Sequence, residues 1–165
     1  MAARGPVLVD TNTILECHRT GCWAALAGHW PLETVEDCIT ETQTGAHKRP
    51  ADERIDEAAL RASFANVYAV TPMELAKVAL LGGPHLDAGE RALWAHALGR
   101  KDAWRLCGPD RASMKFGAQN KLQDRLVSLG ALLADAGARP RSPLKAHFED
   151  AWLRQVVVTI MMGGV

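Results

Sequence analysis

Residues 6–12 have the sequence PVLVDTN, in which a short apolar run leads directly into an acidic residue. A run of this length, rich in β-branched side chains, predicts a buried strand that ends at Val9. Asp10 then follows the carboxyl end of the strand, and a helical pattern begins at Thr11. Open α/β sheets bind their ligands beyond the carboxyl ends of the strands, so Asp10 is the first candidate for a functional residue.

Further apolar runs alternate with helical patterns along the chain. Additional strands are expected at 32–35, 67–70 and 103–107, with a candidate fifth at 125–127. Helices are expected between them, including one over 51–65, one after Thr71, one after Asp87, and a last one that begins at Ser142. This alternation predicts a three-layer α/β/α fold with a central, mostly parallel sheet of four or five strands. We expect a single domain over residues 1–165, of which 140–165 form a C-terminal helical extension.

The composition limits the classes of function. Nineteen basic and nineteen acidic residues cancel, so a nucleic-acid site must be a local patch. The four cysteines form no CxxC pair and no leader is evident, which is typical of reduced thiols in a cytoplasmic protein. Cys17, His18 and Cys22 lack a second ligand pair for zinc, and buried cysteines are the better interpretation. Apolar runs are too short to cross a membrane.

Four acidic residues are expected at the carboxyl edge of the sheet. Asp10 and Asp110 follow the first and fourth strands, Glu41 and Glu90 lie on helices that reach the same edge, and Asp87 is a further candidate. Carboxylates that share one site repel each other and stay ionised only if cations bind among them. Hard oxygen ligands favour Mg²⁺ or Mn²⁺, and such ions promote hydrolysis of phosphodiesters.

Each acid also has a structural interpretation. Asp10 and Asp110 are in positions that suit helix caps, and Glu41 alone is typical of a solvated helix face. Asp87-x-x-Glu90 fits a capping box, in which the glutamate only accepts a backbone hydrogen bond. A third possibility, phosphoryl transfer through Asp10, is disfavoured because dehalogenase-like phosphatases have a second aspartate where this chain has Asn12.

The order of these motifs resembles the PIN-domain family of metal-dependent ribonucleases. The resemblance covers most of the first 137 residues. It rests on VLVDTNTILE at 7–16, TVEDCITET at 34–42, LDAGERALWAHAL at 86–98, LCGPDRASM at 106–114 and LVSLGALLADAG at 126–137. Each motif alone is weak, and the specificity comes from their order.

This resemblance implies an acidic pocket that binds Mg²⁺ or Mn²⁺ and cuts RNA. The catalytic and metal-binding positions of the family match Asp10, Glu41, Glu90 and Asp110. Thr11 or Asn12 would support the first aspartate. Many members are toxins of toxin–antitoxin pairs, so an antitoxin protein and a homodimer are implied partners. Some relatives carry another acid beside the fourth-strand aspartate, whereas the next acid here is Asp124, which leaves one or two metal ions open.

RNA would also need phosphate contacts near the acids. Basic candidates follow two of the proposed ligands: His47, Lys48 and Arg49 in one loop, and Arg111 and Lys115 after the fourth strand. The tryptophans lie among apolar neighbours and are expected to pack in the core. An alternative function is a catalytically weak or inactive PIN-like module that binds RNA or a protein partner.

Overall fold

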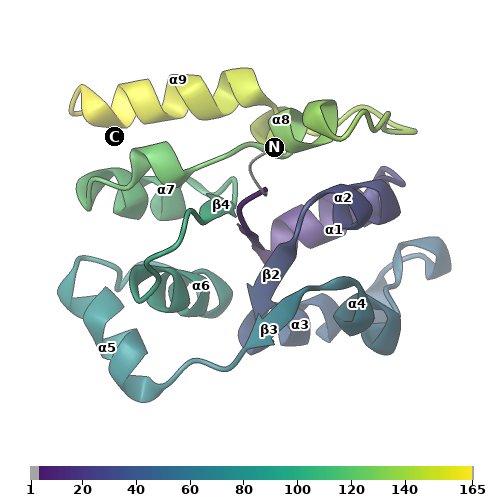
Figure 1. The fold of residues 1–165 in the computed structure, drawn as a ribbon, viewed down its shortest axis with the longest axis horizontal. Helices are drawn as coiled ribbons and strands as arrows, with labels where there is room; N and C mark the ends of the chain where they lie inside the picture. The colour runs from purple at the N-terminus through teal and green to yellow at the C-terminus, as the bar shows by residue number, and fades with distance from the viewer. Residues whose placement is uncertain (1–3, 165) are drawn as a thin grey trace.

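The computed structural model describes residues 4–164, apart from the side chains of residues 46 and 52. Its sheet has four parallel strands in the order β3-β2-β1-β4. The strands are β1 (Val7–Val9), β2 (Leu32–Val35), β3 (Asn66–Tyr68) and β4 (Arg105–Cys107). Helices cover both faces, so the expected three-layer α/β/α fold is confirmed (Figure 1).

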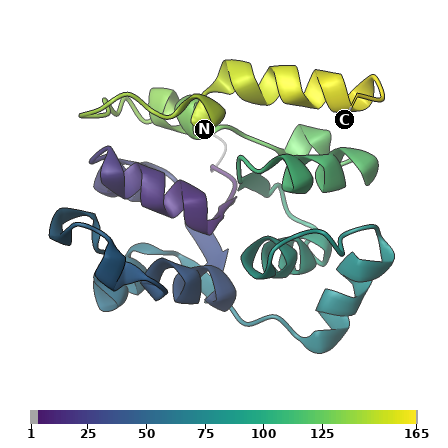
Figure 2. The same ribbon diagram turned by 180° about the vertical axis from the view of Figure 1, so that it is seen from behind.

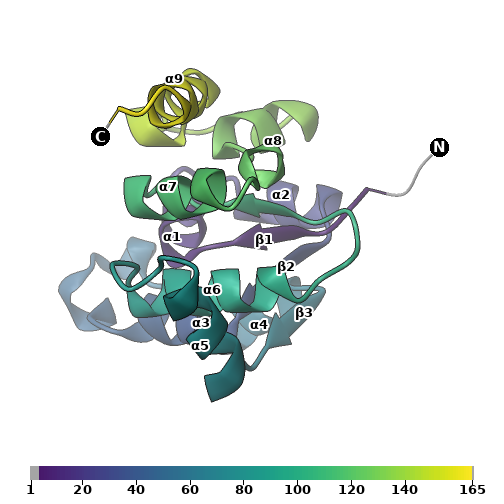
Figure 3. The ribbon, with the colours of Figure 1, turned by 90° about the vertical axis from the view of Figure 1, so that its left-hand side faces the viewer.

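The helices lie between and after the strands. They are α1 (Thr11–Arg19), α2 (Trp23–His29), α3 (Glu36–Gln43), α4 (Glu57–Ser63), α5 (Pro72–Leu80), α6 (Ala88–Leu98), α7 (Arg111–Gln119), α8 (Leu129–Asp135) and α9 (Asp150–Met161). Short 3-10 turns are η1 (Ala46–Lys48), η2 (Ala51–Glu53), η3 (Gln123–Arg125) and η4 (Ala146–Phe148). Helix α9 packs on α7 and α8, beyond the layer that covers the sheet (Figure 3).

Capping residues set several helix starts. The side chain of Thr71 accepts a hydrogen bond from the Glu74 amide, and Pro72 occupies the first turn of α5. Asp87 and Glu90 form the predicted capping box of α6. These two helix starts are therefore confirmed.

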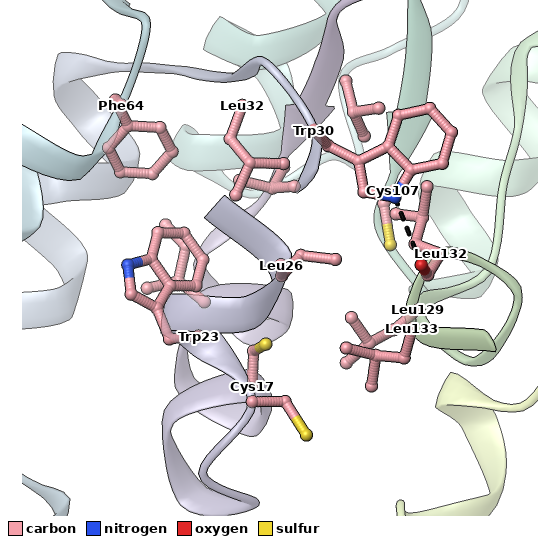
Figure 4. Packing of buried hydrophobic residues seen from close by; sticks show 14 of the residues in the cluster. Cys17, Trp23, Leu26, Trp30, Leu32, Phe64, Cys107, Leu129, Leu132 and Leu133 are labelled. Atoms are coloured by element: carbon pink, nitrogen blue, oxygen red, sulfur yellow. Dashed lines mark hydrogen bonds between the residues drawn. The ribbon is translucent and has the colours of Figure 1, made fainter. Parts of the chain in front are cut away.

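Strand β1 is buried on both faces of the sheet, as expected for a central parallel strand. Val7 and Val9 belong to a core that α1, α2, α4 and α8 complete, whereas Leu8 belongs to a core formed with α5, α6 and α7. In the first core, the Trp30 indole N–H donates to the Leu132 carbonyl at 3.1 Å (Figure 4). Four tryptophans are buried as predicted, and Trp152 is half-buried: the buried four are Trp23, Trp30, Trp94 and Trp104.

Three predicted boundaries are wrong. The candidate strand 125–127 forms the end of η3 and one isolated bridge between Leu126 and Leu106. The helix expected over 51–65 begins only at Glu57, after η2. The last helix begins at Asp150 instead of Ser142, because tertiary hydrogen bonds hold residues 143–145 against α1 and only the short turn η4 follows them. Residue 165, the last of the predicted extension, lies outside the described residues.

The four cysteines are free and buried, as expected. Burial raises the pKa of the Cys38 and Cys107 thiols to about 12. Among the described His, Cys, Asp and Glu side chains, no group of three could hold a metal ion. No helix in the same range has the length and apolarity needed to span a membrane.

Candidate active site at the carboxyl edge of the sheet

The carboxyl edge of the sheet holds a small acidic pocket. Strands β1 and β4 are neighbours, and the connections from β1 and β4 lead to opposite sides of the sheet, which is the arrangement that opens a crevice between strand ends. The pocket has a volume of about 60 Å³. This acidic pocket is lined by Asp10, Thr11, Asn12, Glu41, Asp87 and Glu90. Three of the four predicted acids therefore meet there, together with the further candidate Asp87.

Asp10 is buried at the end of β1, with 4% of its surface exposed. Its Oδ1 atom accepts a hydrogen bond from the Thr13 amide at 2.8 Å and so caps α1. Burial raises the pKa of Asp10 to about 7, hydrogen bonding from Thr13 partly offsets this, and the charges of Asp87 and Asp110 raise it further. On the other side, a Cβ atom at Gly108 would lie 3.2 Å from Oδ2, so the β4–α7 turn passes close to this carboxylate.

Glu90 is equally buried at the start of α6, with 6% exposed. Its amide donates to Asp87 Oδ1 at 2.8 Å, and its Oε2 accepts from the Asp87 amide at 3.4 Å. Burial raises the pKa of Glu90 to about 8, with further increases from the charges of Asp110, Asp87 and Asp10. The capping interpretation is confirmed, and the same glutamate also lines the acidic pocket.

Glu41 joins three helices at the pocket. Its Oε2 atom accepts from the Thr11 hydroxyl at 2.7 Å, and its Oε1 atom accepts from the Gly89 amide at 2.9 Å. A Cβ atom at Gly89 would lie 2.6 Å from Oε2, so the glycine gives this carboxylate room. The sequence prediction assigned Thr11 or Asn12 to the support of Asp10, but Thr11 holds Glu41, and Asn12 lies exposed on the pocket wall.

Two supporting residues were missed in the sequence. Thr13 supplies the amide that holds Asp10, and its hydroxyl donates to the Cys107 carbonyl at 3.1 Å, which links α1 to the end of β4. Gly89 supplies the amide that holds Glu41. The position three residues after a capping aspartate was a signal for Thr13, whereas nothing in the sequence pointed to the bond between Gly89 and Glu41.

Asp110 lies beside the acidic pocket and does not line it. Its Oδ1 atom caps α7 by accepting from the Ala112 amide at 2.8 Å and the Ser113 amide at 3.3 Å. It still raises the pKa of both Asp10 and Glu90, so its charge acts within the site.

The predicted basic residues lie outside the acidic pocket. Arg49 donates to the carbonyls of Thr42 at 2.6 Å and Thr44 at 3.3 Å. The exposed guanidinium of Arg111 lies over the Trp152 ring, 5.9 Å from its centroid. Lys115 lines a separate cavity of about 200 Å³ beside α7. His47 and Lys48 are exposed on η1.

The donor chemistry of the site fits a hard divalent cation. All candidate ligands are carboxylate oxygens, the type that Mg²⁺ and Mn²⁺ prefer. Across residues 4–164 no three of these groups lie close enough to form a ready-made ion site, and both oxygens of Glu41 are already engaged. Asp10, Glu90, Asp87 and Asp110 are coupled by charge. Of these four, Asp10, Glu90 and Asp110 are the positions that the sequence predicts as ligands, and they would be the residues to hold an ion.

Comparison with protein-family models, curated proteins and solved structures finds no match for this chain.

Proposed function

We propose that this protein is an endoribonuclease that hydrolyses RNA phosphodiester bonds with Mg²⁺ or Mn²⁺. The observation that carries the proposal is the pair of buried carboxylates, Asp10 and Glu90, whose charges face other acids at the carboxyl edge of the sheet. In the described part of the chain neither makes an ion pair with Lys, Arg or His. The motif order that resembles PIN-domain nucleases supports the same chemistry.

Each acid has a distinct place in the proposed mechanism. Asp10, Glu90 and Asp110 would hold the cation, and the chemistry it would supply there is charge neutralisation at the scissile phosphate and a lower pKa for an attacking water. Thr13 fixes the orientation of Asp10 through its amide. Glu41 keeps α1 and α6 at a constant separation by bonding to Thr11 and Gly89. These bonds set the spacing between carboxylates before substrate arrives, which limits reorganisation during the reaction.

The decisive experiment replaces Asp10 with Asn. The amide oxygen can still accept the Thr13 hydrogen bond, so the cap of α1 is kept while the negative charge is lost. Cleavage of labelled RNA in Mn²⁺ should fall by roughly 100-fold or more, as expected when a group that positions the reacting atoms is lost. Circular dichroism should show an unchanged fold.

Asp56→Asn is the matched control for that variant. Asp56 caps α4 in the same manner, through a bond from the Ala59 amide at 2.8 Å, and is exposed. Its replacement should leave cleavage unchanged. Full activity in Asp10→Asn, or cleavage that survives EDTA, would rule out the proposed mechanism.

A second candidate function is an RNA-binding or partner-binding module without turnover. It is favoured by the absence, across residues 4–164, of a preformed group of three metal ligands, and by the engagement of both Glu41 oxygens. This function predicts RNA or partner binding without cleavage in any divalent ion.

The resemblance to PIN-domain nucleases also suggests a location and partners for this protein. We place the protein in the cytoplasm, where its reduced thiols are stable, as the toxin of a toxin–antitoxin pair or as a stand-alone nuclease, with a homodimer as its assembly. A small DNA-binding protein encoded beside it, whose co-expression relieves growth arrest, would support the toxin role. Unimpaired growth on expression of the active protein alone would contradict it.

A further inference from the structure

A second and larger cavity meets the acidic pocket on the side of α1. It has a volume of about 360 Å³, within the range of small-ligand pockets, roughly 300 to 1,000 Å³. This side cavity is lined in part by Asn12, Leu15, Arg49, Lys145, His147 and Phe148. Asn12 lines both cavities, so the side cavity lies next to the acidic pocket.

Two cations face the side cavity from different parts of the chain. Arg49 lies in the loop after α3, and its bonds to two backbone carbonyls hold its guanidinium in place without cancelling its charge. Lys145 lies in the segment before α9, and the described part of the chain offers its ammonium no hydrogen bond or ion pair. Arg19 forms an ion pair with Glu16 at 2.6 Å, and the charge of Lys145 acts on the same carboxylate without forming a pair. Glu53 is the remaining acid on the lining.

An apolar and aromatic surface completes the side cavity. Leu15 of α1 and Phe148 of η4 contribute apolar area, and the His147 ring lies 4.3 Å from the Phe148 ring. Rings of this kind offer a flat surface against which a nucleobase can stack.

The segment that carries Lys145 is anchored to α1. The Lys145 amide donates to the buried Glu16 Oε2 at 2.7 Å, and Arg19 donates to the Pro143 carbonyl at 2.9 Å. The Arg141 amide also donates to the Thr20 carbonyl at 2.9 Å. Figure 2 shows this segment on one side of α1 and the loop after α3 on the other. The wall is therefore formed before a ligand binds.

We propose that the side cavity is a nucleotide subsite for single-stranded RNA. Lys145 and Arg49 bind backbone phosphates, the base stacks on His147, and the next phosphodiester passes Asn12 to reach the acidic pocket. A paired base cannot enter, because recognition by stacking needs a base that is turned out of a helix. The location of the cut bond rests on the proposed function, whereas binding in the subsite does not.

The test measures binding of a fluorescein-labelled oligouridylate by anisotropy, with full-length protein in EDTA so that no cleavage occurs. Lys145→Ala should weaken binding about tenfold, as expected for loss of one charged contact. It should also lower the slope of log affinity against log salt by about 0.7, the value for one phosphate contact on a single strand. His147→Ala should weaken binding at least fivefold, roughly the effect of one lost stacking contact, with the salt slope unchanged.

Lys101→Ala is the control, because Lys101 is exposed in the turn before β4, at the opposite edge of the sheet. The subsite would be overturned if Lys145→Ala bound RNA with the same affinity and salt slope as Lys101→Ala and the unmodified protein. The charge-reversed variant Lys145→Glu would have to show the same unchanged binding. Equal binding of duplex RNA would overturn the single-strand assignment. Lys145-dependent binding without cleavage in any divalent ion would keep the subsite and reject the nuclease, and cleavage without dependence on Lys145 would do the reverse.

Discussion

The two edges of the sheet each hold a buried glutamate, but the charges beside these two glutamates have opposite signs. Near the amino edge, Glu33 is 5% exposed and pairs with Arg100, which also binds Asp102 at 2.6 Å. At the carboxyl edge, Glu90 is 6% exposed, and the charges that act on it come from other acids, Asp110 first among them. The two glutamates are buried to the same extent, so they differ only in the charge beside them: a cation at Glu33 and acids at Glu90. One edge is complete by itself, whereas the other requires a proton or a cation.

The amino edge is further closed by rings around Arg100. Its guanidinium lies 5.7 Å from the centroid of the Tyr68 ring, and that ring stacks on His96 at 3.9 Å. Hydrogen bonds to Asp102 and Glu33 raise the pKa of Arg100 above its ordinary value. This network links β2, β3 and α6 without leaving a charge for a ligand. The contrast indicates which edge is structural and which is available for function.

The largest effect on the free energy of unfolding should come from removing the cation that pairs with Glu33 at the amino edge. Arg100→Ala leaves Glu33 buried without its cation, which is expected to lower the free energy of unfolding by about 3 to 5 kcal/mol. Urea denaturation measures this. Arg61→Ala is the control, because Arg61 forms half-exposed ion pairs with Glu36 and Glu57 and should lose only about 0 to 1 kcal/mol. Similar losses in both variants would contradict the difference between buried and exposed pairs.

The next largest effect on stability should come from binding of a divalent cation to the acids at the carboxyl edge. Mn²⁺ at one hundred times its dissociation constant should stabilise the folded protein by about 2.7 kcal/mol, measured as a rise in melting temperature. Glu90→Gln should remove most of this rise, because it removes one of the charges that attract the ion. If Mn²⁺ and Mg²⁺ leave the melting temperature of the unmodified protein unchanged, this edge binds no such ion.

Without metal ions, the contribution of Asp10 and Glu90 to the free energy of unfolding should fall as the pH rises from about 4 to about 8. The pKa of Asp10 rises from 3.8 to about 7 on folding, and that of Glu90 from 4.5 to about 8, both chiefly through burial. In this range these two carboxyls therefore bind more protons in the folded protein than in the unfolded chain. The stability they contribute is fully present below about pH 4 and is lost as the pH rises through the folded pKa values.

Asp10→Asn should flatten this pH dependence and be more stable than the unmodified protein by about 2 kcal/mol at pH 8. Asp56→Asn should keep the original pH profile, because that cap is exposed. Urea denaturation across the pH range compares the three proteins. Lower stability of Asp10→Asn at pH 8 would show that the cap of α1 outweighs the repulsion among the acids.

The smallest effect concerns the bond between Glu41 and Gly89. Gly89→Ala places a methyl group against the Glu41 carboxylate and breaks their hydrogen bond, but alanine also favours the helix by up to about 1 kcal/mol. In a Glu41→Ala background only the helix gain remains, so the same substitution should stabilise. A double-mutant cycle should give a coupling of about 1 kcal/mol, and a value near zero would contradict the contact.

The sequence predicted the features that depend on neighbouring residues. The apolar run before Asp10 predicts β1, and the spacing of Asp87 and Glu90 predicts the start of α6, because strand burial and helix capping are local. The convergence of acids at one edge followed from parallel strands, whose carboxyl ends share that edge.

Features that depend on distant contacts could not be predicted in the same way. The apolar pattern near Ser142 suggested a helix, but residues 143–145 bond to α1 instead, and only the short turn η4 precedes the start of α9 at Asp150. Lys145 was therefore not recognised as lining a cavity. The number of strands also depended on contacts between distant residues. The candidate fifth strand meets β4 only at one bridge, between Leu126 and Leu106, where the Val127 amide donates to the Leu106 carbonyl at 3.0 Å.

The bond between the Lys145 amide and Glu16 spans 129 positions of the sequence. Closing so long a loop costs conformational entropy before the contact stabilises anything, so this pairing belongs to a late stage of folding. During synthesis, the four strands, which end at Cys107, leave the ribosome before residue 145 does. The wall of the side cavity is completed only after that residue has emerged, so the nascent chain carries its acidic residues for some time before it carries the complete cavity beside them.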